Sequence, residues 1–150
     1  FGRLGGVILD PSHCWLISIG DDVTLAPRVH ILCHDAGTKV HLGYTKIGRV
    51  NIGNRVFIGA ESIVLPNVNI GDDVIIGAGS IVTKDIPDGM VAAGNPARVI
   101  CTTDEYLDKH KKQMEDAPVY DVDHTLRGNL TEEKKQQQIK ELTGKIGYIE

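Results

Sequence analysis

The chain has 150 residues, with 16 Lys and Arg, 20 Asp and Glu, and a formal net charge of −4. This size predicts one domain with room for an appendage, and the acidic balance without any basic run argues against a nucleic-acid partner. No apolar run approaches the roughly 18 residues of a membrane-spanning helix. Cys14, Cys33 and Cys101 form no CxxC pair, so we expect reduced thiols in a cytoplasmic protein.

An aliphatic residue recurs every six positions on both sides of one interruption. The series is Ile19, Leu25, Ile31, then Ile52, Ile58, Val64, Ile70, Ile76 and Val82. A period of six fits the alternation of strands and not the 3.6-residue period of a helix. We therefore predict short strands with three hexads to a triangular coil, and coils that stack residues 18 positions apart, such as Ile52 on Ile70. Glycine follows most of these aliphatics, and we expect it to provide unusual backbone angles and close approach at each corner.

The hexads stop between Ile31 and Ile52, which are 21 residues apart. We count this as three residues more than one coil, and we expect the segment 32–46 to leave the coil as a projecting loop. His34 stands where this loop leaves the coil. His41 lies further out, where we expect a surface residue.

The segment 102–150 has a different composition and lacks the hexads. Thr103 with Asp104 can cap a helix that runs to Met114, and Thr131 can cap a second helix that ends before Gly144. We therefore divide the chain into a β-domain at 1–101 and a helical extension at 102–150.

The run IGNRVFIGAESIVLPNVNIGDDVIIGAGSIVTKDIPDGMVAAGNPARVI resembles the hexapeptide-repeat acyltransferases, and its most specific parts are IVTKDIP and GNPARVI. It is most similar to sugar O-acetyltransferases of the galactoside and maltose type. The stretches DPSHCWLISIGDDVTLAPRVHILCHD and LGYTKIG are similar to the branch associated with capsular and cell-surface polysaccharides. Over residues 7–101 the resemblance implies an all-β fold, a single-stranded left-handed parallel β-helix. Residues 102–150 would add a short α-helical C-terminal tail. It also implies a homotrimer that uses acetyl-CoA as co-substrate.

His34 is the predicted catalytic residue, because a neutral imidazole accepts protons near neutral pH and can act as a general base on a sugar hydroxyl. The resemblance places the catalytic histidine shortly after hexads that here read LAPRVHI. Cys33 adjoins His34, but neighbours in an extended segment face opposite ways, so we do not expect a catalytic cysteine. Asp35 and a backbone carbonyl stay open as groups that orient His34. Some hexapeptide β-helices bind zinc through three histidines, two of them in an HxxxxH pair. His34 and His41 are seven residues apart and do not form such a pair, so no metal is expected.

The resemblance also implies the binding residues. For the acceptor these are His13 and Trp15, with packing of Trp15 in a subunit interface as an open alternative; the family's acceptor-binding asparagine is replaced here by Gly6. For the coenzyme they are Ala60, Ala78, Thr83, Lys84 and Arg98. Lys84 ends the regular repeat, where its charge can reach a phosphate.

These features predict an enzyme that moves an acetyl group from acetyl-CoA to a hydroxyl of a sugar or cell-surface polysaccharide precursor. The acetyl group is transferred by direct attack, without a covalent acyl-enzyme. Two alternatives stay open: an N-acetyltransferase of a nucleotide-linked amino sugar, and a catalytically silent β-helix that serves as a binding or assembly module.

Overall fold

The structure is a computed structural model that describes residues 5–150. The chain divides into two compact units, one that ends at Glu105 and one that spans Tyr106–Glu150. The boundary therefore lies within the helix Thr103–Met114, a few residues after the division that the sequence predicted at residue 101. Among the described residues, no helix has the length and hydropathy that crossing a membrane requires.

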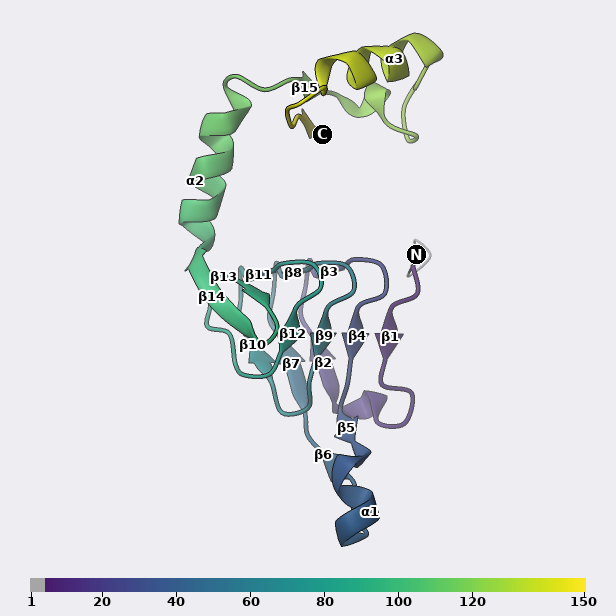
Figure 1. The fold of residues 1–150 in the computed structure, drawn as a ribbon, viewed down its shortest axis with the longest axis vertical. Coiled ribbons are helices and arrows are strands. Elements are labelled where there is room, and N and C mark those ends of the chain that lie inside the picture. Colours follow the sequence, from purple (N-terminus) through teal and green to yellow (C-terminus); the bar gives the residue numbers. More distant parts are fainter. Residues whose placement is uncertain (1–4) are drawn as a thin grey trace. The chain divides into compact units, whose positions relative to one another are not determined.

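The first unit is a triangular β-helix whose short strands visit three sheets in turn (Figure 1). Sheet A contains β1 (Ile8–Leu9), β4 (His30–Ile31), β9 (Ile63–Val64) and β12 (Ile81–Val82). Sheet B contains β2 (Ile17–Ile19), β7 (Val50–Ile52) and β10 (Asn69–Ile70). Sheet C contains β3 (Thr24–Leu25), β8 (Phe57–Ile58), β11 (Ile75–Ile76), β13 (Met90–Gly94) and β14 (Ala97–Thr102). All pairs in these sheets are parallel except β13 with β14, which form an antiparallel hairpin.

The hexad aliphatics stack in register, as predicted. Ile52 pairs with Ile70, Ile58 with Ile76, and Val64 with Val82, each 18 residues apart. Their side chains point into the prism and are at most 3% exposed. Each buried isoleucine or valine contributes about 1.5–3 kcal/mol to folding, so a run of stacked coils supplies the core that a coil by itself lacks.

The interruption is longer than the spacing count suggested. Across it, Ile19 pairs with Ile52 and Ile31 with Val64, so the paired residues lie 33 positions apart. That distance is one 18-residue coil plus 15 inserted residues, and the predicted excess of three was wrong. The count treated Ile31 to Ile52 as a full coil, whereas Ile31 belongs to sheet A and Ile52 to sheet B, the next face of the prism.

The predicted loop 32–46 leaves the coil only after Cys33, because Leu32 still bonds to Val64 and Cys33 lies in the core. The rest of it projects from the coil and has structure of its own (Figure 1). It contains β5 (His34–Asp35), the 3-10 helix η2 (Ala36–Thr38), α1 (Lys39–Leu42) and β6 (Lys46–Ile47). Strand β5 pairs antiparallel with β6, which closes the neck of the insertion. His34 is therefore anchored in a ladder, while His41 is exposed in α1.

The sequence assigned two properties of each corner, the unusual backbone angle and the close approach of the coils, to one glycine. In the structure, two different positions of the corner provide them. The left-handed backbone angle falls three residues after the aliphatic, mostly on polar residues: Asp22, Arg28, Arg55, Glu61, Asn67 and Asp73, with Gly79 in the same series. The glycine directly after the aliphatic does not have a positive φ, so the expectation of unusual angles there was wrong. Its close approach is confirmed, because a Cβ on Gly59 would lie 2.5 Å from the backbone nitrogen of Ala78 in the next coil.

The C-terminal part contains α2 (Thr103–Met114), β15 (Val119–Tyr120), η3 (Val122–His124), α3 (Glu132–Glu141) and β16 (Tyr148–Ile149). Thr131 caps α3 by accepting a hydrogen bond from the backbone N–H of Lys134 at 3.3 Å. Both expected helices are present. The parallel pairing of β15 with β16 was not anticipated from the sequence.

We expect the substitution Gly59→Ala to lower the free energy of unfolding by about 2–3 kcal/mol, because the new methyl group would force two stacked coils apart. Thermal and denaturant unfolding measure the change. The control Gly37→Ala makes the same chemical change in the exposed insertion and should stay within about 0.5 kcal/mol of the parent. Equal stability of the two variants would contradict the close approach of the coils at Gly59.

Candidate active site

The carboxyl ends of the sheet A strands bring together residues that are distant in the sequence (Figure 1). Asp10 directly follows β1, Cys33 and His34 come shortly after β4, and Thr83 with Lys84 follows β12. The order β1-β4-β9-β12 places the last two residues two strand spacings from the edge of β4, or about 10 Å. This edge of sheet A is where the insertion leaves the coil.

Asp10 contacts more residues of the site than any other side chain described in it. Its carboxylate is fully buried and accepts four hydrogen bonds. Oδ1 accepts from the backbone N–H groups of Ser12 at 2.9 Å and His13 at 3.1 Å. Oδ2 accepts from the backbone N–H of Cys33 at 2.8 Å and lies 2.6 Å from Nδ1 of His34. One carboxylate thus joins the turn after β1 to the start of the insertion.

These contacts determine the charge of Asp10. Burial alone would raise the pKa of this carboxyl, but the hydrogen bonds from Cys33, His34, Ser12 and His13 outweigh that effect and hold the pKa well below its usual range. The group is therefore a carboxylate at neutral pH, and it can only accept hydrogen bonds.

His34 is placed as the sequence predicted, at the neck of the insertion. Its side chain is 33% exposed, so one part of the ring faces Asp10 and another part is open to solvent. Asp35 does not contact the ring: its carboxylate pairs with Nζ of Lys46 at 3.0 Å and accepts from the backbone N–H of Gly37 at 2.9 Å. The group that holds His34 is Asp10, which lies 24 residues earlier in the chain.

Cys33 is buried in the core of the β-helix. Burial raises the pKa of its thiol, and the nearby Asp10 carboxylate raises it further. A buried, protonated thiol is a poor nucleophile, in agreement with the assignment of Cys33 to structure and not to chemistry.

His13 and Trp15 lie beside His34, so the predicted substrate-binding residues and the predicted base occupy one place. The ring centroids of His13 and His34 are 5.3 Å apart, and those of His13 and Trp15 are also 5.3 Å apart. Trp15, in the 3-10 helix η1 (Cys14–Leu16), is 73% exposed. Among residues 5–150, Nδ1 of His13 is a buried side-chain atom without a hydrogen-bond partner.

Asp10, His13 and His34 together offer three potential metal-ligand atoms within 4.8 Å of one another. The arrangement fits a hydrogen-bonded pair better than a metal cage. All four lone-pair directions of the carboxylate are occupied, and 2.6 Å between Asp10 Oδ2 and His34 Nδ1 is the length of a strong hydrogen bond. Nδ1 of His13 lies 3.9 Å from Asp10 Oδ1, beyond hydrogen-bonding range.

The five predicted coenzyme-binding residues fall into separate groups. Ala60 and Ala78 lie in stacked turns between sheets C and A, where the backbone N–H of Gly79 donates to the Ala60 carbonyl at 2.8 Å. Thr83 and Lys84 are exposed at the opposite edge of sheet A. Arg98 is exposed on β14, opposite Ala93 of β13. Four of these residues therefore flank sheet A, while Arg98 lies on sheet C, and the five are spread over the surface of the protomer.

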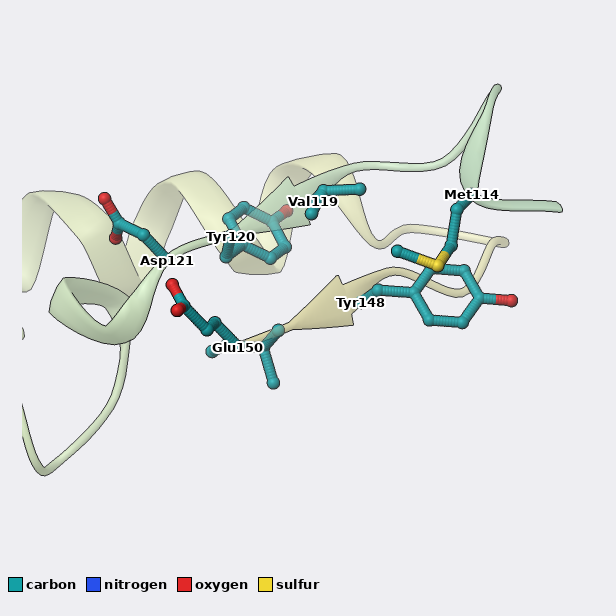
Figure 2. A pocket seen from close by; sticks show the side chains of 7 residues that line it. Met114, Val119, Tyr120, Asp121, Tyr148 and Glu150 are labelled. Carbon is teal, nitrogen blue, oxygen red and sulfur yellow. The ribbon is translucent and has the colours of Figure 1, made fainter. Parts of the chain in front are cut away.

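A separate hollow of about 480 Å³ lies in the second unit (Figure 2). Apolar side chains from β15 and β16 line it together with carboxylates at one end. Its lining residues are Met114, Val119, Tyr120, Asp121, Tyr148, Ile149 and Glu150. The residues predicted for catalysis and binding all belong to the first unit.

The sequence analysis missed Asp10, although a local signal was present. The run Asp10-Pro11-Ser12 is typical of a turn in which an aspartate side chain accepts the N–H two residues later, as it does here. That signal predicts a turn and not a partner, because the contact with His34 depends on the stacking of β1 on β4.

Comparison with known proteins places this geometry in a family. Residues 49–84 match the family model of the bacterial transferase hexapeptide (six repeats). Protein CapG of Staphylococcus aureus is 43% identical over 127 residues, which are 82% of this chain and 69% of CapG. The chain spans about half the length of three further curated relatives, among them the galactoside O-acetyltransferase of Escherichia coli.

Solved structures agree. A galactoside acetyltransferase in complex with coenzyme A matches with a TM-score of 0.56 and 41% identity, over 61% of this chain and 48% of that chain. AntD, an N-acyltransferase from Bacillus cereus solved with dTDP-4-amino-4,6-dideoxyglucose and coenzyme A, matches with a TM-score of 0.51 and 28% identity, over 65% of this chain and 60% of that chain. The repeat, the stacked coils and the extended similarity to CapG lead to one conclusion: the chain belongs to the bacterial hexapeptide-repeat acetyltransferases and has their left-handed parallel β-helix.

Proposed function

We propose that this protein transfers an acetyl group from acetyl-CoA to a hydroxyl of a sugar or cell-surface polysaccharide precursor, with His34 as the general base. One observation carries the proposal. In a fold shared with coenzyme A-bound relatives, the neck of the insertion presents a partly exposed imidazole whose Nδ1 is held by a buried carboxylate. Such an imidazole has its second nitrogen free for proton transfer.

The reaction needs few groups. Nε2 of His34 takes the proton of the acceptor hydroxyl while the hydroxyl oxygen forms a bond to the thioester carbonyl carbon. The carbon–sulfur bond then breaks, and the proton passes from the imidazolium to the leaving thiolate. The products are the acetyl ester and the free thiol of coenzyme A, and His34 returns to its neutral form.

His13 and Trp15 are proposed to hold the acceptor. The exposed indole beside His34 offers an apolar face for the C–H surface of a sugar ring. The partly exposed imidazole of His13 adds a second polar ring beside His34 for hydrogen bonds to the acceptor. Both residues come from one short stretch after β1, so they can position an acceptor as a unit.

On the donor side, Ala60, Ala78, Thr83, Lys84 and Arg98 remain the proposed coenzyme contacts. Lys84 and Arg98 are exposed cations suited to phosphates, and the small side chains leave room for the pantetheine arm. The three cysteines are free thiols, which supports a reducing compartment such as the cytoplasm.

A thiol-release assay with acetyl-CoA tests the proposal and its closest alternative. Methyl β-galactoside and maltose present hydroxyl acceptors, and a nucleotide-linked amino sugar of the kind bound to AntD presents an amine. Release with the hydroxyl acceptors supports O-acetylation. Release with the amino sugar alone would replace it with N-acetylation, and no release with any acceptor would favour a binding module.

We expect His34→Asn to lower kcat by about 10²–10⁴-fold, because asparagine can still donate to Asp10 but cannot accept the proton. The KM for acetyl-CoA should change little. The matched variant His41→Asn, in the exposed helix α1, should keep the parent rate. Undiminished transfer by His34→Asn would refute the assignment of the base.

A homotrimer is the proposed assembly, and the surface of the prism supports it. The outward row of sheet A contains Ile8, His30, Ile63 and Ile81, and that of sheet C contains Thr24, Phe57 and Ile75. The outward row of sheet B is polar, with Ser18, Asn51 and Asn69. Two largely apolar faces and one polar face suit a ring of three protomers. In such a ring, the two apolar faces of each protomer pack against its neighbours and the polar face stays in solvent. Such a ring would also unite the donor residues that flank sheet A.

We expect Ile63→Arg to convert the assembly to monomers, because it would bury an unpaired charge between protomers. The molar mass measured by light scattering coupled to size-exclusion chromatography should fall from about three times the 16.3 kDa chain mass to the mass of one chain. The circular dichroism spectrum should stay unchanged. The control Ser18→Arg, on sheet B, should leave the assembly intact. Monomeric parent protein, or dissociation by both variants, would contradict this arrangement of faces.

A further inference from the structure

We propose that Asp10 is a positioning residue that holds His34 in the Nδ1–H tautomer and directs Nε2 toward the acceptor. The inference rests on the proposed function only in calling His34 the base. Its structural content, the tautomer of one imidazole, stands on the contacts of Asp10 alone.

The tautomer follows from hydrogen-bond valence. The carboxylate is an acceptor only, so the hydrogen in its 2.6 Å contact with Nδ1 must come from the imidazole. A neutral imidazole carries one N–H, and when that N–H is at Nδ1 the lone pair is at Nε2. Asp10 therefore selects which nitrogen can accept a proton.

The orientation of the ring follows from the other contacts of the carboxylate. Backbone N–H groups of Ser12, His13 and Cys33 fix both of its oxygens from two separate segments of chain. The carboxylate cannot rotate toward solvent without breaking these bonds inside a fully buried site. His34 is held on a frame that spans two coils, and the imidazolium formed during transfer would lie against a fixed negative charge.

The substitution Asp10→Asn separates this role from simple packing, because asparagine has nearly the same shape. If its oxygen keeps the bonds from Ser12 and His13, its amide NH₂ faces His34 and donates to Nδ1. The imidazole would then carry its hydrogen at Nε2, where it blocks proton uptake. The loss of the bond from Cys33 also weakens the fold, so every measurement is made at a temperature at which circular dichroism shows both proteins folded.

The primary test is nitrogen-15 NMR of histidine-labelled full chain without ligand, at a pH where the imidazole is neutral. Long-range proton–nitrogen correlations distinguish the two tautomers, and comparison with His34→Asn assigns the His34 signals. We expect the Nδ1–H pattern in the parent and a shift to Nε2–H in Asp10→Asn. Asp35→Asn removes a neighbouring carboxylate that does not contact the ring, and it should leave the tautomer unchanged.

The kinetic test uses acetyl-CoA with methyl β-galactoside or maltose. We expect kcat of Asp10→Asn to fall by at least about 10²-fold with little change in the KM for acetyl-CoA, and kcat of Asp35→Asn to stay within twofold of the parent. An unchanged tautomer in Asp10→Asn overturns the role of Asp10, whatever the activity. A changed tautomer with undiminished transfer overturns the assignment of His34 as the base, and with it the catalytic meaning of Asp10.

Discussion

The constraint on which the rest of this structure depends is the register of the coils. After the insertion, Ile52, Ile58 and Val64 each rest on the aliphatic 18 residues later. The corner glycines Gly53, Gly59 and Gly71 lie against the backbone of the next coil. Such a stack has no space for extra residues inside a coil. Fifteen additional residues between Ile31 and Ile52 must therefore leave the prism, and the neck of that insertion is a fixed point on an otherwise regular surface.

The same register brings the site together. Because β1 stacks on β4, the first residue after β1 lies beside the start of the insertion. Asp10 thereby reaches Cys33 and His34, and the turn that follows it carries His13 and Trp15 to the same place. A charge buried at this point would be costly alone. Four hydrogen bonds stabilise it, and three of them come from backbone groups that the fold has already placed.

The donor side depends on a different property of the prism. The residues proposed for coenzyme binding lie at both edges of sheet A and on β14, so one protomer spreads them over its surface. Two apolar outward rows and one polar row suggest how neighbouring protomers would complete the site. In the proposed trimer, the acceptor and the base would lie on one edge of a protomer and the donor between protomers.

The sequence by itself determined the repetitive β-architecture, because a six-residue period is a local pattern that does not depend on tertiary contacts. It also determined the place of the insertion, the candidate base His34 and the two helices of the C-terminal part. Only the tertiary structure decided that the insertion is fifteen residues long and that the left-handed corner angle falls on residues such as Arg55 and Asp73 and not on the adjacent glycines. It alone decided that Asp10, and not Asp35, holds His34. The reason is physical. A period of six is a property of residues close together in the sequence, whereas a hydrogen bond between residues 24 positions apart forms only after the coils have stacked.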